Sequence, residues 1–284
     1  MKAERNMKRT RKRYSGRLFT LLAVIIVLLT VLPGCSDDRE DDWTYVLAWE
    51  DEFDGPEGQL PDSANWKFDT GTDWGNDQLE WDTDRPENVS LDGNGNLRII
   101  ALEERYETCD YTSGRIKTQG LFEQGGGKFE ASIKLPIGQG IWPAFWLLGA
   151  DIGTVGWPDC GEIDIMEYRG QSPNIISGAV HGPGYSGGDA LYRQYLLDGS
   201  FNDDFHVFGI EWTEDRIVWY VDGKEFFNLT KTSVTARGRW VFDHEFFIIL
   251  NVAVGGNYVG PPDDTTVFPQ TMLIDWVRVY RPDR

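Results

Sequence analysis

Three carboxylate side chains lie close together in a segment that otherwise has the composition of a buried strand. Residues 161–168 read Gly-Glu-Ile-Asp-Ile-Met-Glu-Tyr, so Glu162, Asp164 and Glu167 are interleaved with β-branched and apolar residues. Such residues favour a half-buried strand, and a carboxylate is costly to bury without a partner. Acids in this setting are typical of a site that uses carboxylates for nucleophilic or acid–base chemistry.

A regular strand would not bring all three acids to one face. Side chains alternate along a strand, so Glu162 and Asp164 share a face while Glu167 points the other way. A β-bulge at Ile165-Met166 would insert one residue and bring Glu167 beside the other two. Glu162 and Glu167 would then be about 13 Å apart at Cα, which leaves about 5 Å between their carboxyl groups. This separation is that of a retaining rather than an inverting glycosidase.

The string Glu-Ile-Asp-Ile-Met-Glu resembles the active-site motif of glycoside hydrolase family 16. Its Met insertion resembles the bulged laminarinase, agarase and carrageenase side of that family. The resemblance implies that Glu162 is the nucleophile and that Glu167 protonates the leaving oxygen and then activates water, while Asp164 hydrogen-bonds the nucleophile. It implies no cofactor for catalysis. Three acids this close cannot all ionise freely, so the cluster is expected to titrate as a unit.

Other stretches resemble family segments that border the substrate cleft. Strand alternation places Trp142 and Trp146 on the cleft side and Phe145 in the core. The stretches lie at 75–81, 111–118, 140–148 and 250–257. The substrate-binding residues that the resemblance implies are Asn76, Arg115, Trp142, Trp146, Trp157, His181 and Asn251.

Each of these residues also has a structural interpretation. Asn76 lies in a Gly-rich stretch where Asn often serves turn geometry, and Arg115 could be an exposed arginine on a strand face. The tryptophans could belong to the core of a sandwich. His181 could be a structural histidine bonded to a carboxylate, and Asn251 an inward structural amide.

One metal site is expected from the resemblance. Asp275 resembles the family aspartate of a structural Ca²⁺ site on the convex face, with Glu52 and Gly95 as candidate co-ligands. As an alternative to catalysis, the three acids of 161–168 could hold a cation on a lectin-like sandwich. No histidine spacing typical of a zinc site is present in the sequence.

Short strands are the elements that must position these residues. Apolar runs are separated by Gly, Asn, Asp and Pro turns, with the clearest alternation at 128–135 and a tight hairpin signal at Asp222-Gly223. This pattern predicts a sandwich or a barrel. The family resemblance implies an all-β, concanavalin A-like jelly-roll sandwich of two antiparallel sheets, with the catalytic cleft on the concave face.

The N-terminus has the features of an export signal. Eight basic residues precede an apolar run at 18–32 that is short for a membrane span. The run ends Leu-Pro-Gly-Cys, which resembles a bacterial lipobox with Cys35 as the lipidated residue; an uncleaved signal anchor is the alternative. Ser36 is compatible with passage to the outer membrane, on its periplasmic or surface face. The expected organisation is a lipoprotein signal peptide at 1–34, an acidic tether at 35–45 and a catalytic domain at 46–284.

Charge and cysteine content restrict the partners. Without residues 1–34 the chain keeps 19 of its 27 basic and 45 of its 46 acidic residues, a net charge of −26. Such a surface disfavours nucleic acid, anionic lipid and sulfated polysaccharide, and favours a neutral polymer. The domain is expected to be a monomer that meets the membrane only through its lipid anchor. Cys109 and Cys160 form either a disulfide or two buried thiols.

The function that this resemblance implies is endo-acting, retaining hydrolysis of β-1,3-glucan, because the stretch at 157–170 looks like bacterial laminarinases. Mixed-linkage β-1,3-1,4-glucanase action is the nearest alternative. Agarase-type galactanase activity and a non-catalytic carbohydrate-binding lipoprotein are the others.

Overall fold

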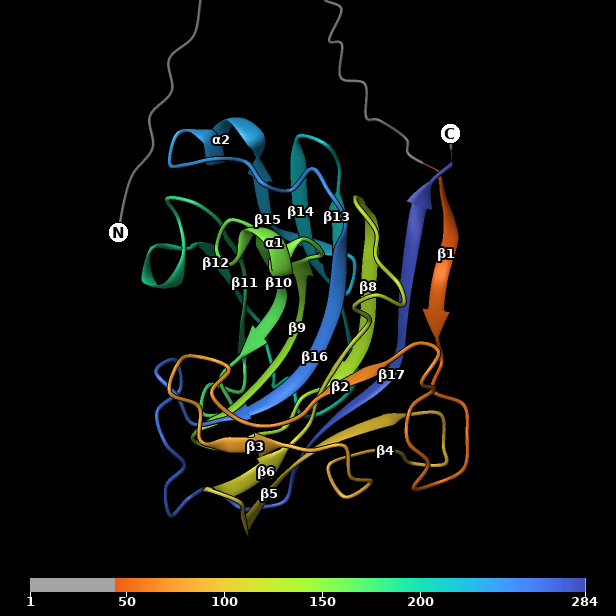
Figure 1. Ribbon diagram of the computed structural model, residues 1–284, viewed down its shortest axis with the longest axis vertical. Helices are drawn as coiled ribbons and strands as arrows, with labels where there is room; N and C mark the ends of the chain where they lie inside the picture. Colours follow the sequence, from red (N-terminus) through yellow and green to blue (C-terminus); the bar gives the residue numbers. More distant parts are fainter. Residues whose placement is uncertain (1–43, 284) are drawn as a thin grey trace, which may run out of the picture. The chain divides into compact units, whose positions relative to one another are not determined.

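A computed structural model describes residues 44–283. The expected signal peptide, Cys35 and most of the acidic tether lie outside the described residues. The fold is an all-β jelly-roll sandwich of two sheets, as the family resemblance implied (Figure 1). No helix of the described part is long and apolar enough to cross a membrane.

The first sheet has ten strands. Its main path runs β15-β14-β13-β8-β17-β5-β6-β3, while β1 pairs with β17 and β4 with β5. The pairs are antiparallel except for β3 and β6, which run parallel, a departure from the expected pattern. The strands are β1 (Tyr45–Asp51), β3 (Glu80–Asp82), β4 (Val89–Leu91), β5 (Leu97–Tyr106), β6 (Cys109–Ser113), β8 (Gly127–Lys134), β13 (His206–Trp212), β14 (Arg216–Val221), β15 (Lys224–Thr230) and β17 (Gln270–Pro282).

The second sheet has seven strands in the order β12-β11-β10-β9-β16-β7-β2, with β9, β10 and β16 side by side in Figure 1. The strands are β2 (Lys67–Asp69), β7 (Arg115–Lys117), β9 (Ile141–Gly149), β10 (Glu162–Tyr168), β11 (Ile175–His181), β12 (Leu191–Leu196) and β16 (Phe246–Val254). The short helices α1 (Ile152–Val155) and α2 (Lys231–Thr235) and the 3₁₀ turn η1 (Gly187–Asp189) lie in connections.

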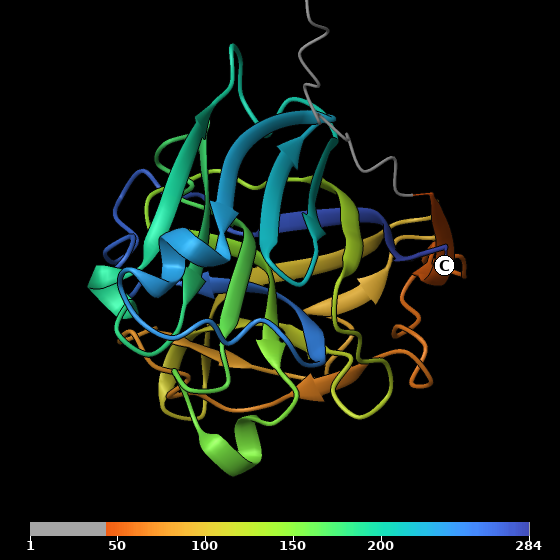
Figure 2. The same ribbon diagram turned by 90° about the horizontal axis from the view of Figure 1, so that it is seen from above.

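The core lies between the sheets. Phe129 and Ile133 of β8 are fully buried, as the alternation at 128–135 predicted, and Phe145 of β9 is buried from the opposite side. In Figure 2 the teal to light-blue strands β13–β15 form one layer and the green strands β9 and β10 belong to the other. The hairpin at Asp222-Gly223 forms as expected, with positive φ at both residues.

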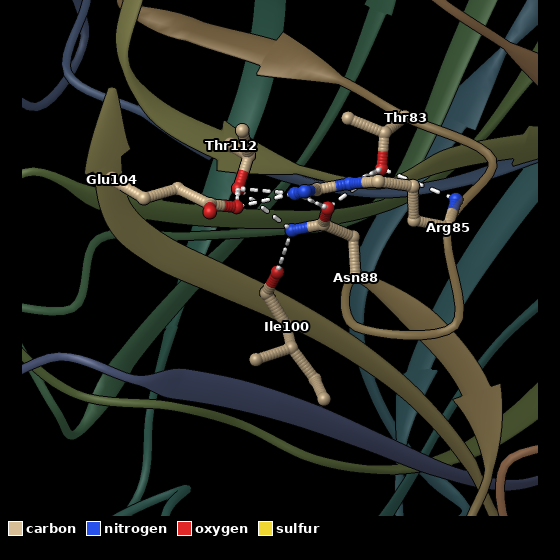
Figure 3. A network of polar contacts seen from close by, with 6 residues as sticks. All are labelled: Thr83, Arg85, Asn88, Ile100, Glu104 and Thr112. Carbon is tan, nitrogen blue, oxygen red and sulfur yellow. Dashed lines mark hydrogen bonds and ion pairs between the residues drawn. The ribbon is translucent and has the colours of Figure 1, made fainter. Parts of the chain in front are cut away.

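A buried polar network fastens the β3–β4 connection to β5 and β6 (Figure 3). Asn88 is fully buried; its amide nitrogen donates to the Ile100 carbonyl and to Thr112 Oγ1, each at 3.0 Å. Its amide oxygen accepts from Thr83 Oγ1 and from Arg85, which also pairs with Glu104. Because a buried amide needs most of its hydrogen bonds satisfied, this network fixes the loop that leads from β3 back to the sheet.

Candidate active site

The bulge expected in β10 is present. Asp164 pairs with Ala179 and Glu167 with Ser177 of β11, so two residues of β10 oppose one residue of β11 between these pairs. The register shifts at the same place against β9. Ile163 and Ile165 are buried in the core, while the three carboxylates share the face away from it. The bulge thus brings Glu167 to the face of Glu162 and Asp164.

The opposite sheet braces the bulge. Trp219 of β14 is fully buried and donates its indole N–H to the main-chain oxygen of Asp164 at 2.8 Å. Gly178 of β11 gives the indole room, because a Cβ there would lie 2.5 Å from the Trp219 ring. This hydrogen bond crosses the sandwich and fixes a carbonyl at the point where β10 leaves regular pairing.

We expect Trp219→Phe to lower the free energy of unfolding by about 1–3 kcal/mol, because a buried carbonyl loses its donor. We also expect kcat to fall by about 10²-fold with KM little changed, since relaxation of the bulge would misplace Glu167 relative to Glu162. Urea unfolding and steady-state kinetics measure the two effects. Trp276→Phe, on β17 of the same ten-stranded sheet as Trp219, is the control. An unchanged kcat would show that strand pairing alone holds the bulge.

Two tryptophans that were expected to bind substrate donate hydrogen bonds to the carboxylates. Trp157 Nε1 donates to Glu162 Oε2 at 2.9 Å, and Trp142 Nε1 donates to Glu167 Oε1 at 3.2 Å. Trp142 is almost buried and lies against Tyr258, with ring centroids 5.0 Å apart. Trp157 is 48% exposed, so its indole can hold the carboxylate at one edge while the ring still faces solvent.

His181 contacts the same cluster on the side of Glu162. Its Nδ1 accepts from the Gly187 N–H at 3.0 Å, which leaves the ring proton of the neutral form on Nε2. Nε2 lies 3.1 Å from Asp164 Oδ2 and 3.6 Å from Glu162 Oε1. Asp164 Oδ2 accepts no hydrogen bond within the described residues, so His181 lies against the carboxylates without a hydrogen bond to Asp164. Its role as a substrate ligand stays a prediction.

Burial raises the pKa of all three carboxyl groups. For Glu162 the charge of Asp164 adds to the effect of burial, while His181 and the Trp157 N–H oppose it. For Glu167 the order is burial, then Asp164, with opposition from His181, the Trp142 N–H and Arg169. The pKa of Asp164 rises through burial. Because the three groups lie in one enclosed cluster and repel one another, they are expected to hold fewer than three charges near neutral pH.

Three predicted binding residues lie on neighbouring strands β7, β16 and β9, next to β10. The strand pairings place Arg115 beside Asn251, and Asn251 beside Ala144, the neighbour of Glu167. Trp146 donates to Asn251 Oδ1 at 2.8 Å. Cross-strand pairs share a face, so Arg115, Trp146 and Asn251 lie on the catalytic face as predicted.

Arg115 is held firmly rather than exposed. Its guanidinium lies 4.9 Å from the centroids of both Trp74 and Trp146, and its Nε donates to Asp69 at 3.0 Å. Lys117 pairs with the other oxygen of Asp69. This rigid setting suits an arginine that presents its remaining N–H donors to a ligand.

Asn76 has the geometry of a turn residue. It is exposed, has φ of 56° and accepts the Asn257 N–H at its main-chain oxygen. Among residues 44–283, no hydrogen bond to its side chain is present. Its role as a sugar ligand stays a prediction.

Two buried acids next to Arg115 were not singled out as site residues from the sequence. Glu80 and Asp82 on β3 are 1% and 2% exposed. Burial raises the pKa of Glu80 to about 7, against the opposing Val254 N–H and Arg115. Burial and the charge of Glu80 raise the pKa of Asp82 well above its usual range. Strand spacing alone places both acids on one face, but only the packing shows that this face is enclosed.

The calcium site expected from Glu52, Gly95 and Asp275 stays a prediction. Both carboxylate oxygens of Glu52 accept hydrogen bonds from Arg278, at 2.6 and 2.8 Å, and Gly95 has a positive φ of 89°. Asp275 accepts from Ser132 Oγ at 3.3 Å. Within residues 44–283, the one group of three metal-type side chains is Glu162, Asp164 and His181, which belongs to the site described above.

The two cysteines are free thiols, so no disulfide joins Cys109 to Cys160. Cys160 is buried, and burial raises its thiol pKa to about 12.

Fold and site together define the class of protein: a β-sandwich glycoside hydrolase with paired carboxylates on one sheet. The chain belongs to glycosyl hydrolases family 16, whose family model matches residues 67–278.

Similar proteins extend over most of the chain. A "Beta-glucanase" of Rhodothermus marinus is 41% identical over 268 residues, covering 89% of this chain and 93% of the relative. The catalytic domain of an endo-1,3-beta-glucanase (laminarinase) from Thermotoga petrophila is 47% identical, with a TM-score of 0.81 over 85% of this chain and 100% of that one. The endo-beta-1,3-glucanase of Pyrococcus furiosus is also 47% identical, with a TM-score of 0.81 over 86% of this chain and 97% of that one.

Proposed function

We propose that the protein is an endo-acting, retaining glycoside hydrolase that cleaves β-1,3-glucan such as laminarin. One observation carries the proposal: the β10 bulge places Glu162 and Glu167 on one face, each held by an indole N–H, in a chain similar to laminarinases. The acidic composition fits a neutral polysaccharide better than a sulfated one.

In this proposal the reaction proceeds in two displacements. Glu162 attacks the anomeric carbon and forms a glycosyl ester, while the leaving oxygen takes the proton of Glu167. Glu167, now ionised, then removes a proton from water, and the water oxygen displaces Glu162 to give a product of retained configuration. Asp164 raises the pKa of Glu167, which supports the retention of a proton on Glu167 before the first step. The chain's own carboxylates supply the chemistry, so no cofactor is invoked.

The test is a product profile of the purified full chain on laminarin, barley mixed-linkage glucan and agarose, with and without EDTA. A ladder of short β-1,3-oligosaccharides from laminarin, unaffected by EDTA, would support the proposal, and NMR of the fresh products would show retention. Cleavage of barley glucan alone would assign mixed-linkage action, and cleavage of agarose alone a galactanase. Binding without cleavage of any of the three would contradict the enzyme proposal, and loss of binding in EDTA would assign Glu162, Asp164 and His181 to a cation site.

We propose further that residues 1–34 direct export and that Cys35 carries a lipid anchor to the bacterial outer membrane, with 35–45 as tether to a monomeric domain. The lipobox-like sequence supports this proposal. In a Gram-negative host we expect the protein in the outer-membrane fraction and Cys35→Ser in the soluble or inner-membrane fraction. A Cys109→Ser control should fractionate like wild type. Identical fractionation of the Cys35 variant and wild type would contradict lipid anchoring.

A further inference from the structure

The catalytic face continues beyond the carboxylates to an open edge. Asp164 is paired with Ala179 of β11, and Ala179 is paired with Tyr192 of β12. Likewise Glu167 neighbours Ser177, and Ser177 neighbours Gln194. Because directly paired residues in antiparallel strands point to the same face, Tyr192 and Gln194 lie on the same face as the catalytic acids. They are two strand spacings from β10, about 10 Å.

β12 is the edge strand of this sheet, and its two faces differ sharply. On the core face, Tyr195 packs against Phe201 and Phe226, with centroid distances of 6.4 and 5.6 Å. On the catalytic face, Tyr192 is 61% exposed and Leu196 is 66% exposed. No hydrogen bond occupies the side chains of Tyr192 or Gln194 within the described residues. An aromatic ring and an apolar side chain therefore stand uncovered on the catalytic face of this edge.

The side chains of β11 that lie between the catalytic acids and β12 are small. Ala179 contributes only a methyl group, and Ser177 is held by a 2.9 Å hydrogen bond to the Tyr258 hydroxyl, which borders the row on one side. A chain that leaves the carboxylates across β11 would therefore meet Tyr192 next. The exposed groups at this end are neutral: a phenol ring and an amide. Aromatic faces bind the apolar faces of sugar rings, and an amide offers both donors and an acceptor to hydroxyl groups.

We propose that Tyr192 and Gln194 form a carbohydrate-binding platform at the β12 edge of the catalytic sheet. Its occupant is the part of the same neutral glucan chain that extends past the sugars bound at Glu162 and Glu167. The identity of the glucan rests on the proposed function. The position of the platform rests on the unbroken strand pairing from β10 through β11 to β12.

The first test compares Tyr192→Ala and Gln194→Ala with wild type on reducing-end-labelled β-1,3-glucan oligosaccharides of increasing length. We expect kcat/KM of Tyr192→Ala to fall by about 5-fold on the longest substrates, with a loss that grows with length. The preferred cleavage position should shift, and its direction tells which end of the chain lies over β12. Tyr192→Phe keeps the ring and should retain most of the efficiency. Leu47→Ala, which changes a 45% exposed apolar residue of β1 on the other sheet, is the control. A loss that is absent, or independent of length, would overturn the platform.

The second test separates this proposal from the proposed function. Affinity electrophoresis in laminarin gels measures binding in the Glu162→Gln background, with and without Tyr192→Ala. Weaker retardation of the double variant supports the platform even if the wild type proves unable to hydrolyse laminarin. Equal retardation of the two variants overturns the platform even if hydrolysis is confirmed.

Discussion

Glu162→Gln is expected to lower kcat/KM on laminarin by about 10⁴-fold or more, because the amide cannot form the glycosyl ester. The fold should survive, since Gln has nearly the same shape and can keep an acceptor oxygen for the Trp157 N–H. Stability at pH 7 should be equal to wild type or higher, because burial and Asp164 raise the pKa of Glu162 and make its charge costly.

Laminarin hydrolysis, measured beside a thermal melt, tests this expectation. Glu103→Gln is the matched control: it is an exposed acid on β5 of the other sheet and should leave the rate unchanged. A Glu162→Gln variant that retained a tenth of the wild-type rate with an intact melt would remove Glu162 from the role of nucleophile.

Glu167→Gln is expected to lower kcat/KM on laminarin by about 10²–10⁴-fold, the usual contribution of a positioned general acid. On an aryl glucan oligosaccharide with a good leaving group, the rate of glycosyl-ester formation should fall less than on laminarin, because that leaving group needs no proton. The glycosyl ester should then accumulate, and azide, which needs no general base, should release it.

The pH profile supplies a second readout. The wild type needs Glu162 ionised and Glu167 protonated, so kcat/KM should fall as pH drops through the pKa of Glu162 and as it rises through that of Glu167. Burial and Asp164 raise the pKa of Glu167, which moves the alkaline limb above the range of an ordinary glutamate. In Glu167→Gln the alkaline limb should disappear. If it persisted, the acid would be a group other than Glu167.

The parts of the site that are local in sequence could be predicted. The bounds of β10 and its bulge followed from counting alternation between Glu162 and Glu167, because the face of each side chain depends only on its place along the strand. The strands whose apolar runs were long were found for the same reason. The short strand β12 was missed. It is an edge strand that exposes most of its residues, so its sequence Leu-Tyr-Arg-Gln-Tyr-Leu lacks the apolar run of a buried strand.

The parts that depend on packing between distant segments could not be predicted. Trp219 reaches the bulge from 55 positions away and from the other sheet. Trp142 and Trp157 were expected to bind substrate, but the hydrogen bonds of their N–H groups to the carboxylates depend on how distant segments approach in three dimensions. The pairing of Glu52 with Arg278 across 226 positions likewise could not be predicted from residue types alone.

The enclosed acids Glu80 and Asp82 make folding a proton-uptake reaction. Arg115 and Lys117 are both paired with Asp69, and within residues 44–283 no ion pair joins a cation to Glu80 or Asp82. The folded pKa of Glu80, about 7, lies above its unfolded value of 4.5, so its proton stabilises the fold fully below pH 4.5 and is lost as pH rises through 7. Asp82 acts in the same direction.

Urea unfolding should therefore show a stability that declines from pH 5 to pH 8, by up to about 3 kcal/mol from Glu80 alone. Glu80→Gln keeps an acceptor for the Val254 N–H and should make this decline less steep, while Asp82 and the catalytic acids maintain the rest of it. An equally steep decline in the variant would contradict the assignment to Glu80. The buried acids of β3 thus make the glucan-binding face more stable at mildly acidic pH. This effect is separate from the protonation of Glu162 and Glu167 that the reaction itself requires.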